Sequence, residues 1–551
     1  MKNLHFFFFF YLLTFSSAFK YSIDSSLIVT DNPTSSGLAF AEYEESLEAT
    51  GWDKLSIASS SLKNYTDFEK SYAMGYLEGV LTHKRISDVF ENFYSMNFYY
   101  EKDSKMPYYL IDFFETQRVW IQENYFHHKN KAYWQAVWAL QIQLEGLIDG
   151  YNSAVGIQKQ ISYAEFQIMA ADGDLPDLFN IDPGHRHKYE NMTAKEIDKK
   201  IELSLHCSSL IKLAPDFSDI YFGHNTWTTY TSMIRIFKEY RYEFSKIPIK
   251  SKAIAFSSHP GTLTSNDDYF LTSSNLAVME TTNPVFNTDL YDLIKPQSLL
   301  YWHRMQVANL LSDNGEEWVR IFSEFNSGTY NNQNIVLNLN KIDTVKGIVN
   351  EGTLWIAEQI PGKIVSEDVT NILKYGYWPS YNVPYFKEIR EISGVDKYIE
   401  LHPELRVSYD YNHCYRANIM RRDQGKITNY EEFKKFLRYN DYKNDPFSFK
   451  NPKFSIASRN DLNTSQLNCT GAIDVKASSY KKVFNEKIST SIIAGPTFGD
   501  YIPAFEWKTA NCLKDPRYKI VGMPEKYDFE WEEYYPKYFG EKDRNVKMEQ
   551  E

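Results

Sequence analysis

Cys207 is the residue whose type and position point most directly to chemistry. It follows a polar, charged connector and begins the apolar run 207–213. If the bond between His206 and Cys207 were cut, Cys207 would carry a free α-amine with a pKa of about 7.7–8.0 beside a thiol with a pKa of about 8.5. A nucleophile activated by its own amino terminus is an established catalytic arrangement. The alternative is that a thiol in a strand is an inert small hydrophobe or half of a disulfide.

The segment after Cys207 brings three more functional side chains towards it. The apolar runs 207–213 and 220–225 flank the sequence Ala-Pro-Asp-Phe-Ser-Asp, which is typical of a turn and predicts a hairpin. Across that hairpin, His224 is expected to orient or polarise a substrate, Asn225 to donate a hydrogen bond and Trp227 to exclude water.

The motifs of other enzyme classes do not occur. The sequence contains no GxSxG, GxxxxGK[ST], GxGxxG or HExxH pattern. His127-His128 and His185-Arg186-His187 lack ligand spacing with a nearby Cys or carboxylate set, so we predict neither a metal nor another cofactor. Asp267 and Asp268 are adjacent, and adjacent strand residues point to opposite faces, so we interpret them as a solvated turn rather than an acid–base pair.

The amino terminus predicts the secretory route. Residues 1–18 combine one basic residue, an apolar core with five consecutive phenylalanines, and a small-residue site ending at Ala18, which describes a signal peptide. The alternative, a membrane anchor, would need about 20 apolar residues. Four glycosylation sequons fit this route, at Asn64, Asn191, Asn463 and Asn468. We therefore expect a secreted or lysosomal protein that is not stably inserted in a membrane.

The four cysteines allow three full pairings, and the sequence does not choose among them. In an oxidising lumen Cys469 and Cys512 are plausible disulfide partners. Cys414 then has no obvious mate, and a bridge between Cys207 and Cys414 is the competitor that would abolish nucleophilic chemistry at Cys207.

Composition and patterning predict an α+β protein. With 43% hydrophobic and 24% charged residues the chain resembles a folded globular protein, and its net charge of −12 argues against nucleic-acid binding. Residues 21–62 read as strands and turns, and 68–156 as helical. Residues 180–205 read as an exposed connector and 229–244 as a helix. Beyond 250, short β-branched runs alternate with turns, interrupted by a helical stretch at 430–439.

Longer segments of the sequence resemble the phospholipase B-like family of lysosomal and secreted hydrolases. The similarity begins with the residues around Cys207 and His224 and spans most of the chain. It lies in 206–212, 224–230, 258–261, 265–268, 280–283, 325–333, 376–384, 420–425 and 495–497.

This resemblance implies a four-layer αββα sandwich of the N-terminal-nucleophile hydrolases, with extra helices. It also implies cleavage before Cys207 that leaves residues 19–206 and 207–551 associated as two chains forming one catalytic unit. The implied activity is removal of fatty acyl groups from glycerophospholipids through a thioester on Cys207. Within this framework we expect Asn326, with Asn225 second, to hold the oxyanion, and Arg422 to bind a phosphate or carboxylate.

Two alternatives remain at this level. An amidase acting on N-acyl substrates would use the same nucleophile and oxyanion site. A non-catalytic lumenal lipid-binding protein would keep the fold without activity, which the presence of Cys207, His224 and Asn326 argues against. The sequence is silent on acyl-chain and positional specificity, on the pH optimum, on oligomeric state, and on whether the cleavage is autocatalytic.

Overall fold

The computed structural model describes residues 20–33, 36–186, 188–202, 207–463, 467–485 and 489–537. The predicted signal peptide and His206 lie outside these residues. The described chain mixes two large sheets with many helices, which confirms the predicted α+β class. None of its helices has the length and apolar character that crossing a membrane requires.

The larger sheet holds eleven strands within the described residues. Its neighbours are antiparallel except β4 and β7, which run parallel, so the two ends of the sheet come from distant parts of the sequence. Its strands, in spatial order, are β15 (Lys363–Asp368), β14 (Leu354–Ile360), β11 (Asn332–Asn338), β10 (Leu276–Thr282), β9 (Tyr269–Thr272), β8 (Ala253–Ser258), β7 (Arg235–Arg241), β4 (Trp52–Ser59), β3 (Ala39–Glu44), β1 (Tyr21–Ile23) and β2 (Val29–Thr30).

The smaller sheet contains six antiparallel strands in the described chain, and Cys207 stands immediately before one of them. Its order is β16 (Tyr377–Ser380), β5 (Ser208–Leu213), β6 (Ile220–Thr229), β17 (Thr470–Ser479), β18 (Thr490–Ala494) and β21 (Glu532–Tyr534). The hairpin predicted from residues 207–225 is present as β5 and β6, which pair Ser209 with His224. Strand β10 of the larger sheet contacts both β5 and β6, so the two sheets meet at this hairpin.

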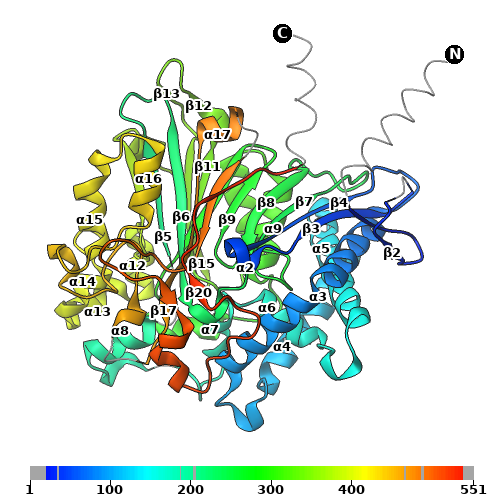
Figure 1. The fold of residues 1–551 in the computed structure, drawn as a ribbon, viewed down its shortest axis with the longest axis horizontal. Coiled ribbons are helices and arrows are strands. Elements are labelled where there is room, and N and C mark those ends of the chain that lie inside the picture. The colour runs from blue at the N-terminus through cyan, green and yellow to red at the C-terminus, as the bar shows by residue number, and fades with distance from the viewer. Residues whose placement is uncertain are drawn as a thin grey trace.

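Helices cover the sheets on opposite sides (Figure 1). Among the helices from the first third of the chain, α3 packs on β1, β3 and β4 of the larger sheet and α5 packs on α3, whereas helix α16 packs on β5, β6 and β17 of the smaller sheet. The helices of the first group are α3 (Asp67–Phe98), α4 (Tyr108–His127), α5 (Lys131–Ala154), α6 (Tyr163–Ala170) and α7 (Leu175–Phe179). The other main helices are α9 (Tyr301–Leu311), α10 (Gly315–Phe322), α12 (Lys387–Ser393), α13 (Val395–Leu401), α14 (Arg406–Tyr409), α15 (Tyr415–Asp423), α16 (Tyr430–Leu437) and α17 (Tyr480–Asn485).

The long helices α3 and α5 begin and pack for identifiable reasons. Thr66 and Glu69 form a reciprocal capping box that satisfies backbone donors at the start of α3. Glycines four residues apart on both helices let the two backbones approach closely. A Cβ atom built at Gly75 would lie 1.8 Å from the carbonyl oxygen of Gln143, and one at Gly146 would lie 2.1 Å from that of Tyr72.

We therefore expect Gly75→Ala to lower the free energy of unfolding by about 3 kcal/mol, because backbone atoms cannot yield to the added methyl group as a flexible side chain would. Gly156→Ala is the matched control. A Cβ at Gly156 meets no atom within 4 Å, and its φ of −70° suits alanine. Urea denaturation should separate the two variants; equal stability would contradict the close approach of the helices.

Two predicted elements differ from the observed ones. Residues 229–244, predicted as a helix, contain a short 3-10 turn (Tyr230–Ser232) followed by strand β7 (Arg235–Arg241), which is buried between β4 and β8. Burial on both faces erased the alternation that would have marked it as a strand. The connector 180–205, predicted to be exposed, contains helix α8 (Ala194–Glu202), whose Ile197 and Ile201 are buried against Phe286 and Tyr398.

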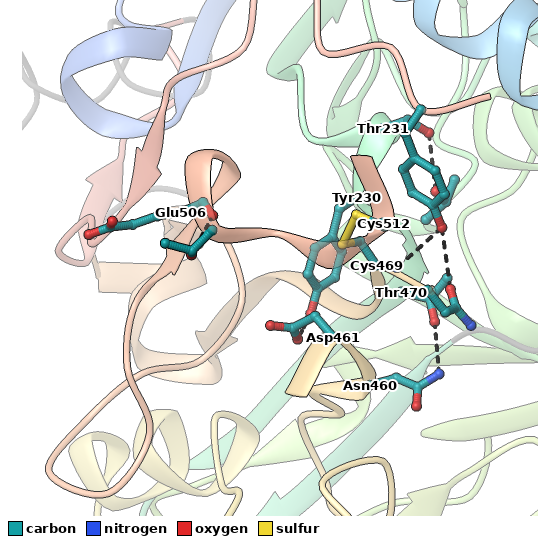
Figure 2. The surroundings of a disulfide bond; sticks show 12 residues. Tyr230, Thr231, Asn460, Asp461, Cys469, Thr470, Glu506 and Cys512 are labelled. Carbon is teal, nitrogen blue, oxygen red and sulfur yellow. Dashed lines mark hydrogen bonds between the residues drawn. A yellow bond between two sulfur atoms is a disulfide. The ribbon is translucent and has the colours of Figure 1, made fainter. Parts of the chain in front are cut away.

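Cys469 and Cys512 are joined by a disulfide, with Cα atoms 5.6 Å apart. Figure 2 shows Tyr230 beside this bridge, where its hydroxyl donates to Asp461 at 2.8 Å. The Tyr230 amide also donates to the carbonyl of Cys469. Strand β6, the second strand of the hairpin after Cys207, ends next to Tyr230. Through the hydrogen bond between Tyr230 and Cys469, this end is connected to the disulfide and to Cys512. Cys207 and Cys414 remain thiols, so the competing Cys207–Cys414 bridge is absent.

Candidate active site around Cys207

Cys207 lies immediately before β5, at the interface of the two sheets. Its side chain is fully buried, and its φ of 123° falls in a region that non-glycine residues rarely adopt. The position is held from the next residue on, because Ser208 pairs with Asn225 and Ser209 with His224. A strained, buried thiol immediately before strand β5 is the geometric centre of the site.

The Cys207 thiol faces a carboxyl group from the other sheet. Its Sγ lies 3.6 Å from Oε1 of Glu280 on β10, which also accepts a hydrogen bond from the Tyr330 hydroxyl at 3.1 Å. Burial, and secondly the charge of Glu280, raise the pKa of the Cys207 thiol, while the backbone N–H of Trp227 lowers it. Burial also raises the pKa of Glu280. In the uncut chain the sulfur is therefore held as a thiol that donates to Glu280.

His224 points to the same side as Cys207, because strand β5 and strand β6 are in register there. The imidazole is fully buried and its Nε2 has no hydrogen-bond partner, whereas Nδ1 lies 3.4 Å from the Thr226 hydroxyl. Burial, reinforced by the nearby Lys476, lowers the pKa of His224 well below its usual range. The ring is thus neutral, with one ring nitrogen as a hydrogen-bond donor and the other as an acceptor.

Asn225 and Trp227 occupy the opposite face of β6. The Asn225 amide donates to the carbonyl of Leu437 at 2.7 Å, on helix α16, so its donor is directed away from the thiol. Trp227 belongs to the buried hydrophobic cluster that also contains Leu437, and it lines the cavity described below. Of the three residues predicted from the hairpin, the structure brings His224 to Cys207, and Trp227 near it through its backbone.

Arg416 on α15 fixes the backbone of Cys207. Its guanidinium donates to the Cys207 carbonyl at 2.6 Å and to the Ser208 hydroxyl at 3.2 Å, and the other nitrogen donates to Asn382 Oδ1 at 2.8 Å. The same group lies 4.4 Å from the centroid of the Trp227 ring. This planar fork, stacked on an aromatic ring, sets the orientation of the residue that carries the thiol.

A buried ion network supports the site from behind. Asp267 pairs with Arg235 and with Lys476, and Lys476 also pairs with Asp474. These groups overcome the opposing effect of burial and hold the pKa of Asp267 well below its usual range. The interpretation of Asp267 and Asp268 as a solvated turn is therefore wrong: both are fully buried, because the partners that neutralise Asp267 lie on β7 and β17, far away in sequence.

A cavity of about 490 Å³ lies next to the site, lined by residues that contact or flank Cys207, whereas the buried Cys207, His224 and Glu280 are not themselves in its wall. Its wall includes Thr226, Trp227, Arg416 and Tyr330 on the side of the thiol, together with Asn283, whose side-chain amide is buried without a hydrogen-bond partner. Apolar side chains line other parts of the wall, among them Phe93, Met96, Phe179 and Val285. A ligand with both polar and apolar parts suits such a lining.

Two predicted site residues lie outside this cavity wall. Asn326 forms a turn: its Oδ1 accepts from the Gly328 amide at 2.9 Å and its Nδ2 donates to the Ile360 carbonyl at 3.4 Å. Arg422 makes bidentate pairs with Asp423 and Asp445. The polar groups of both residues are thus taken up by partners away from Cys207, so the geometry supports neither the oxyanion role of Asn326 nor the anion-binding role of Arg422.

Sequence reasoning missed Glu280, Arg416 and Asn283. Glu280 and Asn283 stand in the segment 280–283 that carries the family resemblance, but no spacing rule connects them to Cys207. Arg416 lies six residues before Arg422, and nothing in its local sequence connects it to Cys207. The signal that would find them is packing across the two sheets, which the sequence does not display.

The predicted glycosylation sites differ in accessibility. Asn64 and Asn191 are exposed, whereas Asn463 and Asn468 are only partly exposed. The Asn468 Oδ1 also accepts a hydrogen bond from the Tyr518 hydroxyl at 3.3 Å, beside the disulfide. Asn64 and Asn191 are thus better placed to receive a glycan.

Buried carboxyls predict that the fold is more stable in acid. Burial raises the pKa of Asp174 to about 6 and that of Glu358 to about 7. From about pH 4 to pH 7 the folded protein then binds more protons than the unfolded chain, so the free energy of unfolding falls as the pH rises. Buried His259 and His303, whose pKa values are lowered to about 3, act in the opposite direction. Asp172 and Asp177, whose pKa values are raised to about 6 and about 7, add to the effect of the carboxyls. We therefore expect a higher melting temperature at pH 5 than at pH 8.

Asp174→Asn checks this origin, because it cannot ionise and its Oδ1 can still accept from Thr329 and Tyr301. The variant should lose about 1.4 kcal/mol of the stability difference between pH 5 and pH 8, because only about one unit of the raised pKa of Asp174 lies above pH 5. Melting curves at both pH values measure this. A pH dependence identical to the wild type would contradict the assignment.

Comparison with known proteins places the chain in a family. The family model described as Phospholipase B matches residues 39–534. Phospholipase B-like protein G of Dictyostelium discoideum is 36% identical, covering 90% of this chain and 86% of that protein. Phospholipase B-like 1 of Bos taurus is 36% identical (90% and 88%), and Phospholipase B of Crotalus adamanteus is 33% identical (94% and 92%). By its sequence along nearly its whole length, and with the segments around Cys207 inside the match, this chain belongs to the phospholipase B family.

Proposed function

We propose that this protein is a secreted or lysosomal hydrolase that removes fatty acyl groups from glycerophospholipids, with Cys207 as an amino-terminal nucleophile. The observation that carries the proposal is the buried Cys207 thiol, which is free of any disulfide and held beside Glu280, directly behind neighbours such as Trp227 and Arg416 that line a cavity with polar and apolar walls. The names of its relatives support a phospholipid substrate. The disulfide and the exposed sequons at Asn64 and Asn191 suit the secretory route.

In the first reaction, cleavage frees Cys207. The sulfur attacks the carbonyl carbon of residue 206 and its proton passes by way of Glu280 to the departing nitrogen. A C–S bond forms and the peptide C–N bond breaks. Water then hydrolyses the thioester, which gives a carboxylate at residue 206 and an α-amine and thiol at Cys207. The left-handed φ of Cys207 supports this step, because the break relieves that strain.

In the second reaction, the α-amine of Cys207 takes the thiol proton and the thiolate attacks the ester carbonyl of the lipid. The amine returns the proton to the departing alcohol, and water hydrolyses the resulting acyl thioester to a fatty acid. Asn283 is the best-placed donor for the oxyanion, since its buried amide lines the cavity and has no partner. Arg416 keeps the Cys207 backbone in place through both reactions.

The proposed class is the N-terminal-nucleophile hydrolases, and the meeting of two sheets between helices supports it. We propose that residues 19–206 and 207–551 stay associated after cleavage. Support comes from β4, which pairs with β7 over seven registered positions inside the larger sheet. A buried ion pair between Glu78 and Lys238, at 2.7 Å, further joins the two parts.

The test compares purified, processed protein on a diacyl phospholipid and on an N-acyl amino acid. Fatty acid released from the phospholipid at a rate that Cys207→Ala abolishes is the expected result. Release only from the N-acyl amino acid would replace the esterase by an amidase. No release from either substrate, with lipid nevertheless bound, would favour a binding protein.

A further inference from the structure

Three buried donor groups converge at the candidate site. Cys207 Sγ, a ring nitrogen of His224 and a carboxylate oxygen of Glu280 all lie within 4.8 Å of one another. Each side chain is fully buried, and two donor atoms, His224 Nε2 and Glu280 Oε2, have no hydrogen-bond partner. Leaving such atoms unsatisfied in the interior costs about 1–3 kcal/mol each, so the pair marks a place where a ligand would be stabilised.

These donor types match one class of ion. Thiolate sulfur, imidazole nitrogen and carboxylate oxygen are the ligands of zinc, with bonds of about 2.3, 2.0–2.1 and 2.0–2.2 Å. Tetrahedral bonds of those lengths place ligand atoms about 3.5 Å apart. Cys207 Sγ and Glu280 Oε1 are already 3.6 Å apart, and the remaining separations need to close by about 1 Å.

Neighbouring groups hold these ligands as outer partners of a metal site do. The Thr226 hydroxyl lies 3.4 Å from His224 Nδ1, which leaves Nε2 without a hydrogen-bond partner, and the Tyr330 hydroxyl donates to Glu280. The positive charge of Lys476 is taken up by Asp267 and Asp474. The surroundings thus offset the one nearby ammonium that would repel a cation.

We propose that Cys207, His224 and Glu280 form an inhibitory Zn²⁺ site. The ion ties up the sulfur, so that it cannot attack a carbonyl. Cleavage before Cys207 adds the α-amine as a fourth donor on the same residue. The site itself needs only the three side chains, whereas inhibition rests on the proposed role of Cys207 as the nucleophile.

Cobalt provides a readout that does not depend on activity, because thiolate-bound Co²⁺ absorbs in the near ultraviolet. We expect purified full chain to bind one Co²⁺ with this absorption, and Zn²⁺ to displace it. Cys207→Ala should remove the band. His224→Asn and Glu280→Gln should weaken binding at least tenfold. Cys414→Ala, which removes the other buried thiol, should bind as the wild type does.

Several results would overturn the site: no thiolate band in the wild type, a band that vanishes in Cys414→Ala rather than Cys207→Ala, or equal affinity in His224→Asn and Glu280→Gln. Melting curves identify any variant that is unfolded, and the remaining variants then decide. If the protein binds the metal but hydrolyses no substrate under any condition, the metal site would stand and the proposed function would be wrong. If the protein hydrolyses the lipid but does not bind Zn²⁺ and is not slowed by it, the metal site alone would be wrong.

Discussion

Replacing Cys207 with alanine is expected to leave the chain uncut before residue 207 and to reduce acyl hydrolysis by about 10⁴-fold or more, the scale on which nucleophile deletions act. Both losses have one cause, because the same sulfur attacks residue 206 in the first reaction and the lipid ester in the second. The side chain is fully buried but small, so alanine should leave the fold intact.

Gel analysis, amino-terminal sequencing and a phospholipid assay measure these outcomes on the same preparation. Cys414→Ala is the matched control, since Cys414, like Cys207, is a buried cysteine that forms no disulfide. It should be processed and active. A Cys207→Ala protein that is cut at residue 207 and retains activity would place the nucleophile elsewhere.

Replacing Arg416 with lysine is expected to lower kcat/KM by about 10²-fold, with a small change in melting temperature. Lysine keeps the charge but has a single terminal nitrogen. It cannot donate at the same time to the Cys207 carbonyl and Ser208 hydroxyl on one side and to Asn382 on the other, as the two guanidinium nitrogens of Arg416 do. The thiol would then sample positions away from the attacking geometry, and a displacement of about 1 Å is enough for such a loss.

The control is Arg422→Lys, an equivalent change on the same helix. Arg422 is about one-third exposed and pairs with Asp423 and Asp445, so this variant should lose some stability and keep its activity. A larger loss of kcat/KM in Arg422→Lys than in Arg416→Lys would restore the role that the sequence suggested for Arg422. Equal activity in Arg416→Lys and wild type would show that the guanidinium contact is not needed.

The hairpin of β5 and β6 was predictable because its signals are local. Two apolar runs around a Pro-Asp turn specify antiparallel neighbours, and the register then puts His224 beside Cys207. The capped helices between residues 67 and 154 were predictable for the same reason, since their periodicity extends over many turns.

Strand β7 and the buried Asp267 were not predictable in this way. A strand covered on both sides loses its alternation, so 229–244 resembled a helix. Two adjacent aspartates look solvated until Arg235 and Lys476 arrive from other strands. Asn326 and Arg422 were plausible by type alone, and only their actual partners assign them to a turn and a surface pair.

The sequence by itself determined the nucleophile candidate, its hairpin partner His224 and the membership in a family, because these depend on residues close together or on long matched segments. Only the tertiary structure decided that Glu280, Arg416 and Asn283 surround Cys207. They lie 73, 209 and 76 positions away. Contacts between residues so far apart arise from the packing of two sheets, which buries the thiol, raises the pKa values of Cys207 and Glu280 and lowers that of His224.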